Sequence, residues 1–355
     1  MPTTRAQVLE AYRKVARKTL TESLRLKPGE TITIETWTAG IPFAAEAALE
    51  AKRLGAYPLV TLEDEKNYVR GVRVAPKKAL GKMGKHEYGL ISNSDAYVFI
   101  PGPPIAGYYP RITRKEFFDS TSYNGSWYGA AKKSHLRGAR LTTGYVGNDM
   151  ARLLGKDRDE IILHQLKAAL ADLGKIRAKA KKLAGVLRDG AKITLATGGS
   201  QLTARLKGEL EIQDGVTSED DVAKGENMSY MPAGYVAKDI DPRSVDGSLQ
   251  VSPSITRFGM LEDAELTFKK GKFVSWSSKK SPGVLKAVEE VAPEKVRLPS
   301  FILVGLNPDM RFGYGQDRFP EGSIAVGVAI TGIVRRGTLT VGGTTVVKDG
   351  KLVRF

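Results

Sequence analysis

The stretch TITIETWTAGIPFAAEAALEAKRLGAYPLVTL, residues 31–62, contains two strand patterns with a helix pattern between them. Residues 31–37 alternate polar and apolar side chains over most of their length, which is the period of a strand. Residues 42–55 are rich in alanine and end at a glycine, which often closes a helix. Residues 57–62 form a second apolar run. Because the connections are short, the three segments predict a strand-helix-strand unit of a parallel sheet.

The same alternation continues on both sides of this unit. Residues 5–28 carry apolar side chains at every third or fourth position, as an amphipathic helix does. Residues 96–102 and 139–147 predict two further buried strands, and residues 157–190 predict one long helix or a broken pair. We therefore expect an α/β fold whose N-terminal domain, residues 1–190, is built on a doubly wound parallel sheet.

From residue 191 onward, strand patterns dominate the sequence. The turns KKGK (269–272) and VKDGK (347–351) are typical of hairpins, and one helix pattern interrupts the strands at residues 281–296. We expect residues 191–355 to form a second, mainly antiparallel α+β domain. Its predicted strands cover residues 192–197, 202–208, 247–253, 263–276, 300–307, 323–330 and 338–353.

The chain of 355 residues has a formal net charge of +16. Its densest basic cluster, residues 175–188, has the apolar spacing of a solvated amphipathic helix. Because no basic run is interleaved with aromatic side chains, we do not expect a nucleic-acid partner. The sequence also lacks an apolar run of about 18 residues and the apolar centre of a secretory signal. We therefore expect a cytoplasmic protein with no membrane span.

The sequence offers few side chains for metal chemistry. It has no cysteine and three histidines, none of them after residue 190. Thiolate sites, disulfides and cysteine nucleophiles are therefore excluded. Asp239 and Asp241 leave open an all-oxygen site for Mg²⁺ or Ca²⁺, although aspartates near turns more often bind their own backbone.

Two segments of the C-terminal half stand out as candidate sites. YMPAGYVAKDIDPRSVDG, residues 230–247, is rich in proline, glycine and aspartate, and we expect it to be mostly turn with Tyr235 at the tip. SFILVGLNPDMRFGYGQDRFPEGS, residues 300–323, runs from a strand into a polar loop whose glycines allow the backbone to approach a ligand. We predict that this loop lines a cleft with Asn307, Asp309, Arg311, Tyr314, Asp317 and Arg318.

Six segments of this half stand in a recognisable order: GGSQLTARLKG (198–208), NMSYMPAGYVAKDIDPRSVDGSLQV (227–251), DAELTFKKGKFV (263–274), LVGLNP (303–308), EGSIAVGVA (321–329) and RRGTLTVGGTTVVKDGKLV (335–353). With LKPGETITIET (26–36) and EAKRLGAYPLVTL (50–62), they resemble the thermophilic metallo-aminopeptidase family, represented by aminopeptidases T and S and leucyl aminopeptidase-like proteins. The resemblance implies an α/β domain, a C-terminal metal-binding domain and a homodimer. The family also includes a ring-cleaving iron dioxygenase of dihydroxypyridines, so the fold does not fix the chemistry.

The resemblance also shows where metal ligands are expected. The family's first glutamate matches Tyr235, and its second matches Ser300 or Phe301. Its histidine falls on Ala325, and its late His-x-Asp pair falls near Ala329 and Thr331. These side chains cannot hold two metal ions and lower the pKa of a bound water. We therefore predict no metal and no cofactor, and we disfavour both ordinary peptidase activity and iron-dependent ring cleavage.

The residues support two hypotheses for the function. In the first, a divergent enzyme acts without the family's metals on a small anionic or aromatic substrate. Tyr235 would be its proton donor or stacking platform, Arg311 and Arg318 would bind an anion, and Asp317 would be a base. In the second, the chain is a non-catalytic binding or scaffold protein in which Tyr235 fills the volume of the lost metals.

Overall fold

The computed structural model describes residues 5–103, 112, 114–251, 253–292, 297–311 and 318–353. The chain divides into two compact units. The first unit comprises residues 1–170 and 215–232, and the second comprises residues 171–214 and 233–355. The chain therefore leaves the first unit after residue 170, returns to it for residues 215–232, and then leaves it again. That an autonomous domain ends near residue 190 stays a prediction.

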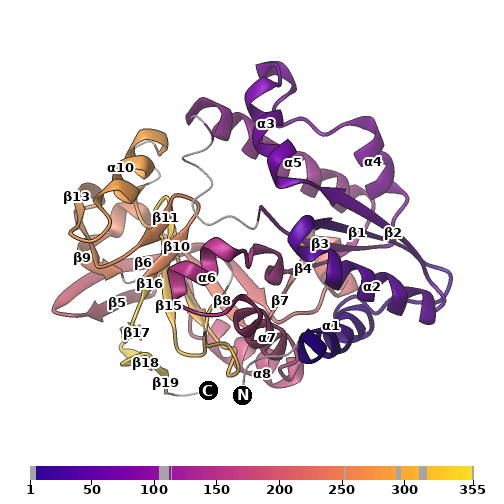
Figure 1. Cartoon of the computed structure of the whole chain (residues 1–355). Coiled ribbons are helices and arrows are strands. Elements are labelled where there is room, and N and C mark those ends of the chain that lie inside the picture. Colours follow the sequence, from indigo (N-terminus) through magenta and orange to yellow (C-terminus); the bar gives the residue numbers. More distant parts are fainter. Residues whose placement is uncertain are drawn as a thin grey trace. The chain divides into compact units, whose positions relative to one another are not determined.

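The first unit is built on a five-stranded sheet in the order β2-β1-β3-β4-β7 (Figure 1). All four pairings are parallel. This confirms the predicted α/β fold with a doubly wound parallel sheet. The strands are β1 (Thr31–Trp37), β2 (Tyr57–Glu63), β3 (Ala96–Ile100), β4 (Arg137–Leu141) and β7 (Met228–Met231).

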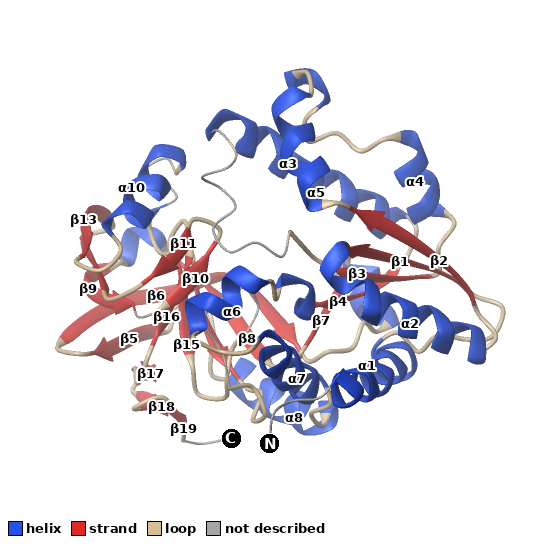
Figure 2. Ribbon diagram, in the orientation of Figure 1, coloured by secondary structure: helices blue, strands red, loops and turns tan. Residues whose placement is uncertain are grey.

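Helices cover both faces of this sheet (Figure 2). On one face, α1 packs against α2 and α7; on the other, α5 packs against α3 and α4. Their bounds are α1 (Arg5–Lys18), α2 (Ile41–Arg53), α3 (Glu65–Val74), α4 (Lys85–Ser92), α5 (Arg114–Lys133), α6 (Asn148–Leu154), α7 (Arg158–Ala169) and α9 (Glu219–Lys224). None of the helices in the described part of the chain is long and apolar enough to cross a membrane.

Two of the expected elements differ in their ends. The strand expected over residues 139–147 ends at Leu141, and a 3-10 turn follows at Thr142–Tyr145. Residues 157–190 form a broken pair of helices, α7 and α8 (Leu173–Ala184), rather than one long helix. The break occurs where the carboxylate of Asp172 accepts the backbone N–H of Lys175 and caps α8, which belongs to the second unit.

The second unit is built on a twelve-stranded, antiparallel sheet whose main path runs β16-β15-β14-β8-β6-β5-β17-β18-β19. One face of it carries a core of aliphatic side chains from these strands, together with Leu183 of α8. A separate hairpin of β10 (Ser254–Thr256) and β11 (Gly259–Leu261) adjoins α10 (Pro282–Val291). The strands of the large sheet are β5 (Lys192–Thr197), β6 (Ser200–Gln213), β8 (Tyr235–Ile240), β9 (Asp246–Val251), β12 (Ala264–Lys269), β13 (Lys272–Ser278), β14 (Phe301–Gly305), β15 (Ile324–Gly327), β16 (Thr331–Val334), β17 (Thr338–Val341), β18 (Thr344–Lys348) and β19 (Lys351–Leu352).

The expectation that residues 230–247 are mostly turn is wrong. Tyr235 is the first residue of β8, is only 5% exposed, and has strands paired on both of its sides. The turn before β8 is short, and Gly234 at φ +118° provides a backbone conformation that other residues rarely adopt. A methyl group on Gly234 would lie 2.9 Å from the backbone nitrogen of Asn307, so this turn passes directly against the end of β14.

Candidate functional site

A pocket lies on the face of the antiparallel sheet opposite to its aliphatic core. β8 forms the floor, between β6 and β14, and is antiparallel to both. Because side chains alternate along a strand, Val236 and Ile240 of β8 enter the core while Tyr235, Ala237 and Asp239 face the pocket. The register places Ala237 between Glu211 of β6 and Leu303 of β14, which brings all three strands into one site.

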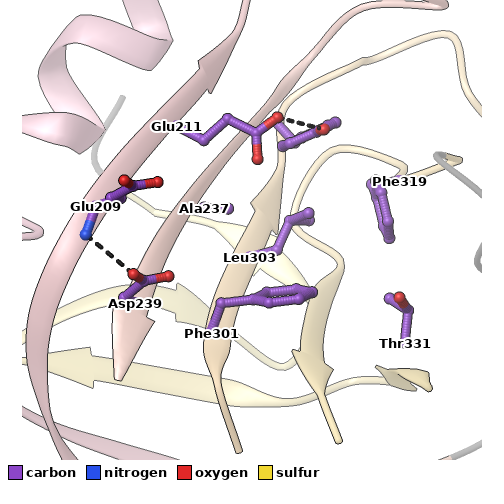
Figure 3. A pocket seen from close by; sticks show the side chains of 9 residues that line it. Glu209, Glu211, Ala237, Asp239, Phe301, Leu303, Phe319 and Thr331 are labelled. Atoms are coloured by element: carbon purple, nitrogen blue, oxygen red, sulfur yellow. Dashed lines mark hydrogen bonds between the residues drawn. The ribbon is translucent and has the colours of Figure 1, made fainter. Parts of the chain in front are cut away.

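This sheet pocket has a volume of about 150 Å³. Figure 3 shows its carboxylates on one side, extending from β6 and β8, with Phe319 and Thr331 on the other side and Phe301 and Leu303 between them. Glu209 and Glu211 are exposed and Asp239 is half-buried, so the acidic side is open to solvent. The lining residues are Glu209, Glu211 and Asp239, the rings of Tyr235, Phe301 and Phe319, and the smaller side chains of Ala237, Leu303 and Thr331.

Tyr235 is fixed in the sheet pocket by contacts at both ends of its side chain. Its hydroxyl donates a hydrogen bond to Oε1 of Glu211 over 2.9 Å, drawn as a dashed line in Figure 3. Its ring meets Phe319 edge to face, with centroids 5.4 Å apart and planes at 79°. The same Oε1 of Glu211 accepts the side-chain amide of Gln213 at 3.0 Å. The phenol is therefore held in one orientation beside a carboxylate.

A bulge in β6 places the two glutamates. The pairing of β6 with β8 shifts register between Leu206 and Leu210, and Gly208 at φ +119° allows the bend. Oδ2 of Asp239 accepts the backbone N–H of Glu209 over 3.0 Å and so holds the strand beyond the bulge.

The same bulge is held from the other face of the sheet. Lys238 donates to the carbonyl of Gly208 and pairs with Asp189 at 2.6 Å. The hydrogen bond from Lys238 lowers the pKa of Asp189.

An aromatic ring covers part of the pocket floor. Phe301 begins β14 directly opposite Asp239, and its ring lies over the backbone of Gly327 in β15. A methyl group added to Gly327 would lie 2.3 Å from that ring, so the ring fits only because residue 327 is glycine. The pocket therefore combines an acidic, open wall with an apolar one.

The comparisons with known proteins bear on this fold. No protein-family model and no curated protein matches the chain. The structure of wild-type AmpT (aminopeptidase T) from Thermus thermophilus matches 97% of this chain and 99% of its own with a TM-score of 0.67 at 15% identity. That of 2,5-dihydroxypyridine dioxygenase from Pseudomonas putida KT2440 matches 100% of this chain and 99% of its own, with a TM-score of 0.63 at 13% identity. The chain has the fold of these two proteins.

The sheet pocket includes three of the positions at which the resemblance implies metal ligands. Tyr235, Phe301 and Thr331 all line it, and Ala325 lies opposite Leu303 in the strand register, whereas Ala329 sits on an exposed turn. Phenol, phenyl, methyl and hydroxyl groups do not form the imidazole and carboxylate set that two transition-metal ions need.

The carboxylates that are present do not replace this set. Asp239 holds the backbone of Glu209, while Asp241 pairs with Arg243 at 3.2 Å, which lowers the pKa of Asp241. The two aspartates therefore do not share one oxygen site. Among the residues that the structure describes, no group of three or more His, Asp or Glu side chains is placed to hold a metal ion. The described residues of the sheet pocket do not fit a dinuclear metal centre.

The structure places the other predicted residues in different surroundings. Asn307 is only 1% exposed, and its amide donates to the carbonyl of Ala233 at 2.6 Å. Its Oδ1 accepts the backbone N–H groups of Asp309 at 3.0 Å and Met310 at 3.1 Å. Asn307 therefore ties the turn after β14 to the turn before β8 and is a structural residue. It is not among the residues that line the sheet pocket.

The predicted arginines do not appear in the described lining. Asp309 and Arg311 are exposed, and Arg318 is 1% exposed beside Phe319, yet none of these three belongs to the lining. Tyr314 and Asp317 lie outside the described residues. Of the predicted site residues that the structure describes, Tyr235 is the one in the sheet pocket.

Sequence reasoning missed Glu209, Glu211 and Phe319. The strand expected over residues 202–208 continues to Gln213, because the bulge at Gly208 bends the strand without ending it. A signal was present: residues 209–212 read Glu-Leu-Glu-Ile, which is the alternation of a strand with one acidic face.

Proposed function

We propose that the protein is an enzyme that transfers a proton to or from a small aromatic or amine-bearing molecule in the sheet pocket, without the paired metals that the family resemblance implies. The hydrogen bond between Tyr235 and Glu211, inside a pocket of rings and carboxylates, carries this proposal. A phenol that donates to a carboxylate can pass its proton to that carboxylate while its oxygen takes a proton from the substrate. When the carboxyl group then returns a proton through the phenol to a different atom of the substrate, both groups are restored and the substrate is isomerised.

The lining indicates the class of substrate. A cavity of about 150 Å³ is of the size that holds one benzene ring. Phe301 and Phe319 offer ring faces and edges, and Asp239 with Glu209 offers acceptors for an ammonium group or other donors. Because the described lining carries carboxylates and neither Arg311 nor Arg318, it favours amines over the anionic substrate expected from the sequence.

A ligand screen followed by two variants tests the proposal. We expect small aromatic amines such as benzylamine, present well above their Kd, to raise the melting temperature by about 2 °C or more, and matched acids such as benzoate to have no effect. The stabilisation should be lost in Asp239→Asn. Tyr235→Phe should retain binding and lose turnover of any substrate found among the stabilising compounds. Glu265→Gln, an exposed change on β12, is the matched control.

The opposite pattern would contradict the proposal. Stabilisation by acids alone would restore the anion-binding hypothesis, and a Tyr235→Phe enzyme with unchanged turnover would remove Tyr235 from the chemistry.

One observation favours the alternative of a non-catalytic binding or scaffold protein. The ring of Phe301 lies on Gly327 and fills part of the sheet face where the resemblance implies metal. In that case Phe301→Ala lowers stability, as truncation of packed rings does, and no compound of the screen binds to the wild-type protein. In the enzyme, the same change enlarges the pocket and shifts its preference to larger amines.

A further inference from the structure

A second cavity lies in the first unit, on the sheet face that α5 covers. It has a volume of about 90 Å³. Glu35 of β1, Phe99 of β3 and Arg140 of β4 form its floor, and they are direct neighbours in the strand register. Tyr123, Trp127 and Tyr128 of α5 form its wall. None of these residues belongs to the sheet pocket, so a ligand bound in this cavity is independent of the proposed function.

The walls of this aromatic cavity are ordered by ring contacts. Trp127 meets Tyr97 and Tyr128 edge to face, each with centroids 5.2 Å apart. The side chain of Arg140 already makes cation–π contacts here. Its guanidinium carbon lies 5.7 Å from the ring centroid of Phe99 and 5.3 Å from that of Tyr230. Ring faces at this distance attract positive charge through their quadrupoles.

Glu35 provides a carboxyl group at the floor of this cavity. It is half-buried, and the hydroxyl of Tyr97 donates a hydrogen bond to it. Tyr97 in turn hydrogen-bonds with the side chain of Trp127, so the carboxyl is held by a chain of two aromatic residues. The hydrogen bond from Tyr97 restrains the carboxyl group of Glu35 among the rings that line the cavity.

The electrostatic surroundings of Glu35 are acidic. Burial raises its pKa to about 7, the hydrogen bond from Tyr97 opposes this, and the nearby carboxylates Glu87 and Glu63 raise it further. Tyr123 hydrogen-bonds to Glu87 at 3.1 Å, and its pKa is raised by burial and by these acids. A positive charge placed in the cavity would be attracted by Glu35 and by the acids around it, while Arg140 on the floor would oppose it.

We propose that this cavity binds a small organic ammonium ion, with Glu35 as its counter-charge and Tyr123, Trp127 and Tyr128 as its aromatic cage. Carboxyl and ring faces together recognise alkylated ammonium groups, whose charge is spread and whose surface is apolar. The volume corresponds to roughly three water molecules, which suits a methylated ammonium head group. Arg140, the cation of the described lining, already lies against the rings of Phe99 and Tyr230, whereas Glu35 is the acidic side chain of that lining.

Binding of the ammonium ion is coupled to the ionisation of Glu35. The cation favours the ionised carboxylate, so binding below pH 7 releases a proton. The groups that face Glu35 are Tyr97 on β3, Glu63 on β2, Glu87 on α4 and Tyr123 on α5, with Arg140 on β4 as the cation of the lining. With a pKa near 7, the ionised fraction rises about tenfold between pH 6 and pH 8, and the affinity should rise by the same factor.

Isothermal titration calorimetry with tetramethylammonium chloride on the full chain tests the proposal, with sodium chloride at equal ionic strength as the reference. We expect affinity about tenfold greater at pH 8 than at pH 6, and proton release at pH 6 measured in two buffers of different ionisation enthalpy. Glu35→Gln should weaken binding at pH 8 by about tenfold or more and abolish the pH dependence. Glu265→Gln should leave both unchanged.

Further variants keep the test decisive. If Glu35→Gln does not fold, as judged by circular dichroism, Tyr128→Leu replaces it, since Tyr128 is 40% exposed and its loss removes one ring of the cage. Weakened binding in this variant supports the proposal. The proposal is overturned by wild-type protein that does not bind tetramethylammonium, by binding that Glu35→Gln or Tyr128→Leu leaves intact, or by binding that is lost in Asp239→Asn of the sheet pocket.

Discussion

The hydroxyl group of Tyr235 reaches Oε1 of Glu211 diagonally across two paired strands, over 2.9 Å. In the register Tyr235 faces Gln213, and Glu211 faces Ala237, so the bond links residues that are not direct partners. A long side chain is needed to span such a diagonal. The bond fixes the phenol over the pocket floor, and it joins the segment 230–247 to a strand that lies about 20 residues earlier in the chain.

A double-mutant cycle measures this bond. Tyr235→Phe and Glu211→Ala should each lower the free energy of unfolding, with an interaction energy of about 0.5 to 1.5 kcal/mol, since the carboxylate is exposed at one side. Urea denaturation of the four proteins provides the values. If the two single changes in the free energy of unfolding add up to that of the double variant, the hydrogen bond does not contribute to stability in solution.

Asn307 should matter more for stability than for ligand binding. Its buried amide makes three hydrogen bonds to backbone groups, so Asn307→Ala should lower the free energy of unfolding by about 2 to 4 kcal/mol. Asp309→Ala, at the exposed neighbouring position, should change it by less than about 0.5 kcal/mol. Chemical denaturation distinguishes the two, and equal effects would argue against a structural role for the amide.

Glu35 should make stability depend on pH. Below its ordinary pKa of 4.5 the carboxyl is protonated in both the folded and the unfolded chain. Between 4.5 and about 7 the folded chain retains a proton that the unfolded chain releases, so the free energy of unfolding falls as the pH rises through this range. The loss should amount to about 1 to 3 kcal/mol.

The measurement compares wild type with Glu35→Gln between pH 4.5 and pH 8. The variant should lack this fall and be the more stable protein at pH 8. Parallel pH profiles for the two proteins would show that Glu35 ionises normally.

Elemental analysis tests the metal prediction. The positions at which the resemblance implies ligands hold Tyr235, Ser300 or Phe301, Ala325, Ala329 and Thr331. We therefore expect purified protein to carry less than one zinc, cobalt, manganese or iron ion per chain. Protein purified after growth with added metal, without chelators, is the stringent sample. One tightly bound ion per chain would favour a true metallo-aminopeptidase instead.

We also expect a homodimer, on the basis of the family resemblance and of sheet edges. The parallel sheet ends at β2, where Leu59 and Leu62 are 50% and 58% exposed, and unpaired edges of this kind are prone to association. Light scattering at several concentrations decides the point. A monomeric mass throughout would leave only the resemblance in its favour.

The parallel sheet was predictable because its signals are local. The helix and strand periods of residues 31–62, and the apolar run at 96–102, each fix their element without reference to distant residues. β7 was not predictable in this way. Met228–Met231 is short, and it joins the sheet only by pairing with β4, about 90 residues earlier in the chain.

The site was predictable only at Tyr235. Its segment was expected to be turn because Pro232, Gly234 and the aspartates dominate the composition, whereas pairing with β6 and β14 on both sides holds residues 235–240 as a strand. Glu211 enters the site through a register set by a bulge, which no local pattern specifies. Long-range pairing, rather than residue type, placed the carboxylates beside the tyrosine.

The return of the chain to the first unit for β7 has a consequence for how the protein is made. During synthesis on the ribosome, residues 171–214 of the second unit emerge before the last strand of the first unit does. The edge of β4 therefore stays open to wrong partners until residues 228–231 have been translated. A protein truncated after residue 190 would lack β7, so the edge of β4 would stay without this partner strand. A fragment that joins residue 170 to residue 215 through a flexible linker would include β7, and is the better starting point for producing the ammonium-binding unit alone.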